Sequence, residues 1–219
     1  RDEEENIIEI LAFGNNVTEY VKLLKYDKLT NLRNRESLRT EIQKNKDYVT
    51  VIVNLDNFSE VNEFYGGYSG DNVIKESAIK LSNMFSDNCV YRLQGDEFAI
   101  LIPLPYKYDR EFEIDSVKNK LKSLFDEALL IEGIDHYISA TFGMHIGSDN
   151  LLRNANIAYK NSKKVNESFS VYSDDMFYKF ADFSNNKQVA FDIKEAIKDD
   201  KIIPFYQPIV DNNTGETVK

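Results

Sequence analysis

The sequence predicts an α/β domain with a ferredoxin-like or palm-like βαββαβ core, a mainly antiparallel central sheet and an N-terminal linker helix. A β-branched apolar run at 48–53 is typical of a central strand that is buried on both faces. Short apolar segments at 89–93 and 98–102 flank a glycine-containing turn, as in a β-hairpin. Segments with helical spacing of apolar residues alternate with these strands, and this order gives the layout.

The region 1–25 is expected to be the linker helix. Apolar residues recur over 6–25 at alternating steps of three and four, which is typical of a coiled-coil-like stripe: Ile10, Phe13, Val17, Tyr20 and Leu24. The interruption Gly14-Asn15-Asn16 leaves open the alternative of an amphipathic helix that packs on its own domain.

The domain itself is expected over 26–175. A short helix at 35–45 precedes the first strand, and three glycines, at Gly66, Gly67 and Gly70, indicate a loop before a helix that begins at Asp71. After the hairpin we expect a helix at 115–130, a strand at 136–146, a helix at 150–164 and a strand at 168–172.

The region 176–219 has a different pattern. The polar segment 174–190 is expected to be a linker, followed by a helix from Val189 to Ile197 and by a strand over 202–210. We therefore expect a second domain to begin near the C-terminal end of this chain.

Composition excludes several classes of protein. Hydrophobic residues make up 42% and charged residues 29% of the chain, and no run of apolar residues is long enough to span a membrane. The net charge of −10 argues against a nucleic-acid partner, although one nucleotide can still bind in a local pocket. A single cysteine, Cys89, allows no intramolecular disulfide and fits the cytoplasm, while upstream regions could attach the parent protein to a membrane.

The predicted hairpin carries the residues with chemical potential. Asp96 and Glu97 lie at its tip, next to Gly95, which lets a phosphate approach the backbone. If the strand that ends in Asn54-Leu55-Asp56 neighbours the hairpin, oxygen ligands converge there as Mg²⁺ requires. A turn of this composition can also merely close a hairpin, so the context has to decide.

Five sequence segments, one of them the hairpin, occur in the order of a known family pattern. They are Tyr26 to Arg35, Asn54 to Glu63 with Gly66 and Gly70-Asp71, Arg92 to Phe98, Ser139 to Gly143, and Ala155 to Lys163. These resemble D-x-L-T-x-L-x-N-R, D-x-D-x-F-K-x-x-N-D…G-H…G-D, R-x-G-G-D-E-F, T-x-S-x-G and A-D-x-A-x-Y-x-A-K. Over about 26–173 the chain is therefore similar to a GGDEF domain.

This resemblance implies a function in cyclic-di-GMP signalling. Active family members condense two GTP molecules into cyclic-di-GMP as a dimer with Mg²⁺. The matching positions imply that Asn62 and Asp71 contact the guanine base, that Asp96 holds metal beside the acid Glu97, and that Lys163 contacts the phosphates. Asp96, Glu97 and Lys163 are thus the expected catalytic residues, and Asn54 is a weakened metal ligand. A carboxamide and a carboxylate together satisfy the hydrogen-bonding edge of guanine.

The departures from the family pattern bear on catalysis. Asn54 stands where the family has a metal-binding Asp, and Glu167 stands where a phosphate-binding Arg is expected. Gln94 replaces the first Gly of the motif, Ser59 replaces a Lys and Gly67 replaces the usual His. Because phosphoryl transfer depends on metal and cationic stabilisation, these changes predict lost cyclisation with base binding retained.

The C-terminal region has a resemblance of its own. Residues from Val189 to Asp211, with Thr214-Gly215, look like the opening of an EAL phosphodiesterase domain. The E-x-L metal ligands of that family are expected beyond Lys219. The partner of the GGDEF domain would then be the EAL domain of the same protein.

Three hypotheses follow. The leading one is a degenerate, regulatory, GTP-binding GGDEF domain of a cyclic-di-GMP phosphodiesterase. The second is an active or weakly active diguanylate cyclase in which Asp56 replaces Asn54 as a metal ligand, since alternate residues of a strand point to one face. The third is a dimerisation module that binds no nucleotide.

Overall fold

The computed structural model describes residues 22, 24–131, 134–199, 201 and 214. The chain divides into two compact units, Arg1–Met176 and Phe177–Lys219, which are described separately. The expected N-terminal helix lies almost wholly outside the described residues, as does the strand expected over 202–210.

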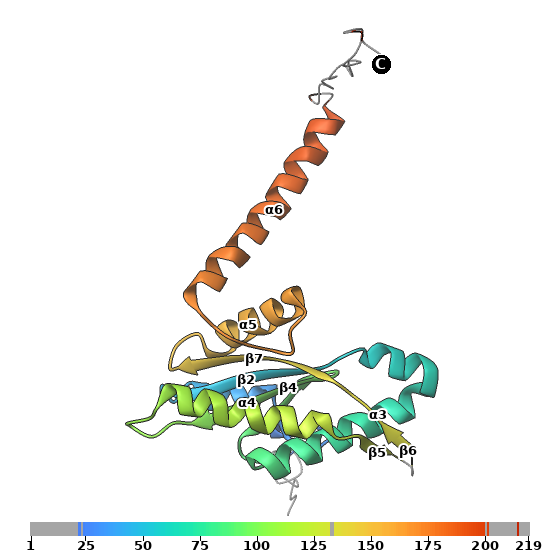
Figure 1. The fold of residues 1–219 in the computed structure, drawn as a ribbon, viewed down its shortest axis with the longest axis vertical. Helices are drawn as coiled ribbons and strands as arrows, with labels where there is room; N and C mark the ends of the chain where they lie inside the picture. Colours follow the sequence, from blue (N-terminus) through green and yellow to red (C-terminus); the bar gives the residue numbers. More distant parts are fainter. Residues whose placement is uncertain (1–21, 23, 132–133, 200, 202–213, 215–219) are drawn as a thin grey trace, which may run out of the picture. The chain divides into compact units, whose positions relative to one another are not determined.

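The first unit is built on a six-stranded sheet in the order β1-β3-β4-β2-β7-β8 (Figure 1). The strands are β1 (Arg33–Asn34), β2 (Tyr48–Leu55), β3 (Val90–Gln94), β4 (Glu97–Pro103), β7 (Ala140–Gly147) and β8 (Phe169–Val171). β2 pairs antiparallel with β4 and β7, and β3 pairs antiparallel with β4; the two outer pairs, β1–β3 and β7–β8, are parallel. The mainly antiparallel sheet confirms the predicted fold class.

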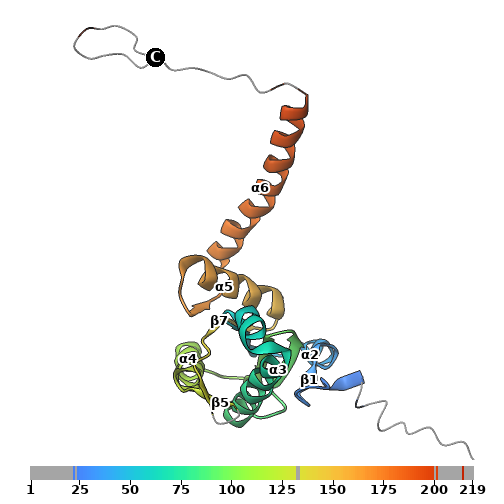
Figure 2. The same cartoon turned by 90° about the vertical axis from the view of Figure 1, so that its right-hand side faces the viewer.

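Helices cover both faces of this sheet. They are α2 (Arg35–Ile42), α3 (Phe58–Phe85), α4 (Arg110–Asp126) and α5 (Leu151–Val165). Figures 1 and 2 show α5 on one side of the sheet and α3 and α4 on the other. A small hairpin of β5 (Leu129–Ile131) and β6 (Ile134–His136) lies beside α3.

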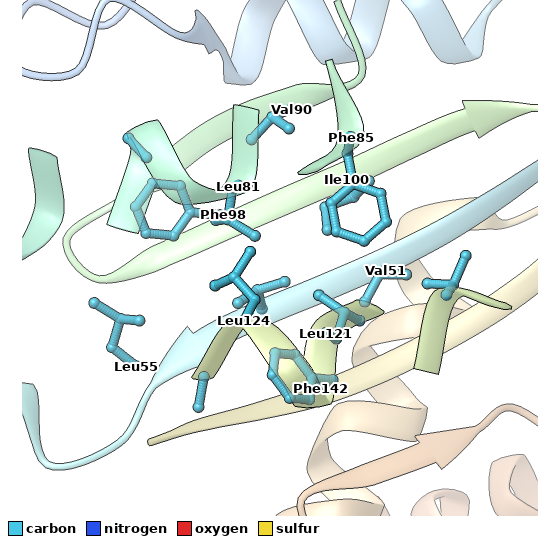
Figure 3. Close-up of a cluster of buried hydrophobic side chains, with 14 of the residues drawn as sticks. Val51, Leu55, Leu81, Phe85, Val90, Phe98, Ile100, Leu121, Leu124 and Phe142 are labelled. Carbon is cyan, nitrogen blue, oxygen red and sulfur yellow. The ribbon is translucent and has the colours of Figure 1, made fainter. Parts of the chain in front are cut away.

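Alternation along β2 explains the two layers. Its odd-numbered residues, such as Val51 and Leu55, belong to a core cluster with Leu81 of α3 and Leu121 of α4 (Figure 3). Its even-numbered apolar residues, Tyr48 and Ile52, belong to a second cluster with residues of α2 and α5. Burial on both faces is what the β-branched run predicted.

The glycine-rich loop is a correction to the sequence prediction. The label α3 covers Phe58–Phe85, which is two helices joined across a kink at Gly66, where φ is 81° and ψ is 161°. The chain therefore breaks at Gly66, as predicted, but the break is shorter than the expected loop. Gly67 and Gly70 are therefore helical, and Asp71 lies inside the helix instead of starting it. Gly70 lies against the Asn62 side chain, since a Cβ there would lie 1.9 Å from Oδ1 of Asn62 unless that carboxamide moved.

Other boundaries also differ. α4 begins at Arg110, because Asp109 caps it by accepting hydrogen bonds from the N–H groups of Glu111 and Phe112. The strand expected over 136–146 is divided between β6 and β7. The segment expected to be a linker belongs to α6 (Asp174–Lys198), a helix that begins well before Val189. No helix among the described residues is long and apolar enough to cross a membrane.

Candidate nucleotide-binding site

The candidate site lies where β2 ends beside the hairpin of β3 and β4. The hairpin strand β4 is the direct neighbour of β2, as the sequence analysis required. In the sheet register Asn54 is opposite Glu97 on one side and opposite Thr141 of β7 on the other. Gly95 adopts the left-handed conformation, with φ 55°, which turns the chain tightly at the tip. A row of polar side chains therefore crosses three strands at one end of the sheet.

Asn54 joins the hairpin to α5. Its Nδ2 donates a hydrogen bond of 3.1 Å to Oδ2 of Asp96. Its Oδ1 accepts a hydrogen bond of 3.0 Å from the hydroxyl of Tyr159. Both ends of the carboxamide are thus used within the chain, one on the hairpin and one on the helix.

Close packing of α5 on β7 brings Tyr159 to this position. A Cβ at Gly143 would lie 2.0 Å from the backbone nitrogen of Tyr159 and 2.3 Å from the carbonyl oxygen of Ala155. Only glycine allows such an approach of helix to strand. The Gly143 of the strand motif therefore sets the height of α5 above the site.

Asp56 lies just beyond β2 and has different partners. Its Oδ2 accepts a hydrogen bond of 2.9 Å from Ser139, and its Oδ1 accepts one of 2.8 Å from Thr141. Lys163 of α5 lies 2.5 Å from the same Oδ1 and forms an ion pair with it. The lysine expected to contact phosphates is thus held by a carboxylate of the same chain.

Glu97 is half-buried next to these groups. Burial raises the pKa of its carboxyl, and the charge of Asp96 adds to the rise, while Arg35 and Lys160 oppose it. Burial also raises the pKa of the Tyr159 hydroxyl, and Asp96 and Glu97 add to that rise. The hydroxyl is therefore a hydrogen-bond donor throughout the physiological pH range.

Arg92 connects the hairpin to the first sequence block. Its guanidinium donates to Oδ1 of Asp27 at 2.8 Å and to the carbonyl oxygen of Gly95 at 2.9 Å. Asp27 also accepts hydrogen bonds from Leu29 and Thr30. Burial raises the pKa of the Asp27 carboxyl, but the hydrogen bonds from Arg92 and Thr30 outweigh it, and the pKa is lowered. Asp27 of the first sequence block therefore holds Arg92, which in turn holds the carbonyl of Gly95 at the hairpin turn.

The beginning of α3 offers backbone donors. Asn57, before the first helical residue, has φ 53°, and its side chain makes no capping hydrogen bond. The first N–H groups of a helix lack partners within it and attract anions when no side chain caps them. Asn57 and Asp56 line one hollow, and Asn54 with Gln94, Gly95, Asp96 and Glu97 lines another.

The residues expected to bind a base lie further along α3. Asn62 precedes the bend at Gly66, and its carboxamide rests over Gly70. Asp71 follows the bend and is exposed. Within the described part of the chain, no hydrogen bond joins either of them to the hairpin. Glu167 follows the end of α5 and is also exposed.

Mg²⁺ in nucleotide sites is usually held by one or two carboxylates together with phosphate oxygens and water. Among the described residues, no group of three or more His, Cys, Asp and Glu lies together. The amide nitrogen of Asn54, a donor, faces Asp96 where a second oxygen ligand would be needed. In this arrangement Asn54 presents a hydrogen-bond donor to Asp96 and does not present the oxygen ligand that Mg²⁺ would need there.

Tyr159 was missed by the sequence analysis, which assigned no role to it. The sequence contains one weak indication that Tyr159 lies at the site: it precedes Lys163 by one helical turn and so shares a helix face with it. Ser139 and Thr141 belong to a block already noted for resemblance, but their hydrogen bonds to Asp56 depend on the pairing of β7 with β2.

Comparison with known proteins agrees with this fold. Residues 24–168 match the family described as "Diguanylate cyclase, GGDEF domain". The chain therefore belongs to the GGDEF family, and it is a domain of cyclic-di-GMP signalling.

Relatives among curated proteins share a low identity over most of this chain. The cyclic di-GMP phosphodiesterase NbdA of Pseudomonas aeruginosa is 24% identical over 210 residues, which are 89% of this chain and 26% of that protein. The bifunctional diguanylate cyclase/cyclic di-GMP phosphodiesterase MucR of the same organism is 24% identical over 88% of this chain and 29% of its own length. The signaling protein YkoW of Bacillus subtilis is 29% identical over 85% of this chain and 25% of its own length. The chain thus spans about a quarter of the length of these relatives.

Solved structures show the same fold. The GGDEF domain of PA1120 (TpbB or YfiN) from Pseudomonas aeruginosa has a TM-score of 0.64 and 21% identity, over 71% of this chain and 99% of that one. The coiled coil and GGDEF domain of DgcB from Caulobacter crescentus, in complex with c-di-GMP, has a TM-score of 0.61 and 17% identity, over 71% and 89%.

Proposed function

We propose that this chain is a regulatory GGDEF domain that binds a guanine nucleotide without cyclising it, in a protein whose output is cyclic-di-GMP phosphodiesterase activity. The observation that carries the proposal is the hydrogen bond from the Asn54 amide to Asp96. It occupies the carboxylate that a cyclase would use for metal.

Loss of cyclisation follows from charge. Phosphoryl transfer needs cations that stabilise the charge developing on the transferred group. Position 54 supplies an amide, position 167 supplies a carboxylate, and Lys163 is paired with Asp56. Arg35 and Lys160 lie near Glu97, but they do not restore the metal-binding carboxylate at position 54 or the cation at position 167.

Base binding rests on other residues. Asn62 and Asp71 provide an amide and a carboxylate that together can satisfy the edge of guanine. Each lies in α3, on either side of the bend at Gly66. The uncapped beginning of α3 can receive phosphate oxygens without a metal. Discrimination against adenine follows, since adenine presents an amino group where guanine presents O6.

The phosphodiesterase output is inferred from the C-terminal resemblance and from relatives. Besides NbdA, the cyclic di-GMP phosphodiesterase PdeR of Escherichia coli is 25% identical over 224 residues, which are 93% of this chain and 33% of that protein. Residues resembling an EAL domain begin near Val189. Nucleotide bound to the GGDEF domain would then regulate the EAL domain of the same protein.

Calorimetric titration of the chain with GTP, and separately with ATP, tests nucleotide binding. We expect GTP to bind and ATP to bind at least about tenfold more weakly, because the contacts to O6 and N2 of guanine are worth about 1.4 kcal/mol or more. Asp71→Ala should abolish the preference, whereas the matched variant Asn83→Ala, exposed on the same helix, should keep it. Absence of GTP binding, or equal binding of ATP, would overturn the proposal.

A second candidate is an active cyclase that uses Asp56 as a metal ligand. It is favoured by the position of Asp56 at the same end of β2 as Asp96, whose segments are joined by a backbone hydrogen bond of 3.3 Å from Leu55 to Asp96. This function requires Asp56 to release Lys163, Ser139 and Thr141. An assay for cyclic-di-GMP after incubation of the chain with GTP and Mg²⁺ decides between the two candidates.

A further inference from the structure

We propose that Tyr159 and Asn54 together take the place of a divalent cation at Asp96, so that the hairpin is held in position without metal. Tyr159 is a positioning residue in this proposal, because it acts on Asp96 only through Asn54. The proposal goes beyond nucleotide regulation, and it concerns the chain without nucleotide.

The direction of the amide is the first step. A carboxamide can be placed either way round, and its neighbours decide which way is favourable. With the amino group toward Asp96, Asn54 donates to the carboxylate at 3.1 Å and accepts from Tyr159 at 3.0 Å. Turned round, the amide oxygen would face the carboxylate and repel it. The charge of Asp96 and the hydroxyl of Tyr159 therefore select the same orientation.

The amide of Asn54 stands where a cation would lie in a site with two carboxylates. An amide nitrogen close to a carboxylate oxygen provides a partial positive charge at the place where a cation would bridge two carboxylates. With Asp at position 54, two carboxylates would lie about 3 Å apart, and both stay ionised only when a cation lies between them. Asn54 removes one of these charges, and its donor group stabilises the other.

The hydrogen bond from Tyr159 to Asn54 acts as a tether that holds the carboxamide in this orientation. A free carboxamide could rotate and offer its oxygen to a metal, but the oxygen of Asn54 is already bonded to Tyr159. The packing of α5 on Gly143 fixes the height of the Tyr159 backbone over β7. The tether therefore makes the arrangement selective against metal.

Thermal unfolding of the chain in EDTA and in millimolar Mg²⁺, at matched ionic strength, tests this proposal. The wild-type Tm should change by less than about 1 °C between the two conditions. Asn54→Asp should lower Tm by about 5 °C in EDTA, and Mg²⁺ should restore at least half of that loss. The matched variant Asn119→Asp, an exposed position on α4, adds the same charge and should show neither effect.

Two outcomes overturn the proposal. One is a wild-type Tm that rises with Mg²⁺ as much as that of Asn54→Asp. The other is an Asn54→Asp variant whose Tm is insensitive to Mg²⁺. If Asn54→Asp does not fold, Tyr159→Phe decides: its Tm should fall by about 3 °C more than that of Tyr106→Phe, which removes a fully exposed hydroxyl. An equal Tm for these two variants also overturns the proposal. Because no nucleotide is present, failure here leaves the GTP titration as a separate result.

Discussion

Asp96 and Asp56 are two carboxylates at the same end of the sheet, and they have different kinds of partner. Asp96, at the hairpin tip, receives the amide of Asn54, which is held by Tyr159. Asp56, beyond β2, receives the ammonium group of Lys163 and the hydroxyls of Ser139 and Thr141. The first carboxylate keeps its charge beside a neutral donor, whereas the second forms an ion pair.

In both cases a side chain of α5 takes part in the contacts of the carboxylate. Tyr159 of α5 contacts Asp96 through Asn54, and Lys163 of α5 contacts Asp56 directly. Tyr159 and Lys163 lie one turn apart on this helix. Asp96 accepts a hydrogen bond from Asn54, and Lys163 is paired with Asp56. Under the proposed function, these contacts would keep the acidic residues of the site in place without the reaction.

The largest expected effect comes from separating α5 from the sheet. Gly143→Ala places a methyl group 2.0 Å from the backbone of Tyr159, where backbone atoms cannot move aside without shifting the helix. We expect a loss of about 3 kcal/mol or more in the free energy of unfolding, measured by urea denaturation.

Gly67→Ala is the matched control for this substitution. Gly67 is helical, and a Cβ there would meet no atom within 4 Å. The variant should be more stable than wild type by about 0.5–1 kcal/mol, because alanine favours the helix. Equal effects of the two substitutions would show that α5 is not held by close packing at Gly143.

An intermediate loss in the free energy of unfolding is expected from substitution of Asp56. Asp56→Asn removes the ion pair with Lys163 and weakens the hydrogen bonds from Ser139 and Thr141. The Asp56 side chain is 20% exposed and that of Lys163 is 41% exposed, so solvent screens the pair in part. We expect a loss of about 1–2 kcal/mol in urea denaturation. Asp87→Asn, at an exposed position after α3, should change stability by less than about 0.5 kcal/mol. A loss no greater than this control would mean that the Asp56 cluster is not structural.

The smallest effect is a change in pH dependence at the hairpin. The pKa of Glu97 is raised from its ordinary value of 4.5, so the folded chain binds this proton more tightly than the unfolded chain. Its contribution to stability is therefore present below about pH 4.5 and is lost as the pH rises through the folded pKa. Glu97→Gln should be more stable than wild type by a few tenths of a kcal/mol (roughly 0.3) at pH 7, with no difference near pH 4.

The control for this comparison is Glu63→Gln, at an exposed position of α3. Urea denaturation at several pH values should give parallel curves for Glu63→Gln and wild type. If Glu97→Gln also runs parallel to wild type, Glu97 does not carry a raised pKa.

Much of the fold could be predicted from short-range patterns. The β-branched run predicted β2, and the glycine-containing turn predicted the hairpin, because both signals depend on neighbouring residues alone. The three glycines of α3 predicted too long a break, since the helix is kinked at Gly66 but continues through Gly67 and Gly70. The capping that starts α4 at Asp109 was also overlooked.

The site could be predicted only in part. The sequence indicated that Asn54 and Asp96 would meet, because adjacent strands bring their ends together. It did not indicate Tyr159, whose contact with Asn54 depends on the height of α5 above β7. Nor did it indicate that Lys163 would pair with Asp56, since that contact joins groups 107 residues apart. Such contacts follow from tertiary packing and leave little trace in local sequence.

The most direct test of this account is an assay for cyclic-di-GMP after incubation of the chain with GTP and Mg²⁺, with an active diguanylate cyclase run in parallel. A site whose carboxylates are already satisfied by Asn54 and Lys163 should form no product above background, while the active enzyme forms it readily. Robust synthesis of cyclic-di-GMP by this chain would contradict the account and favour Asp56 as a metal ligand.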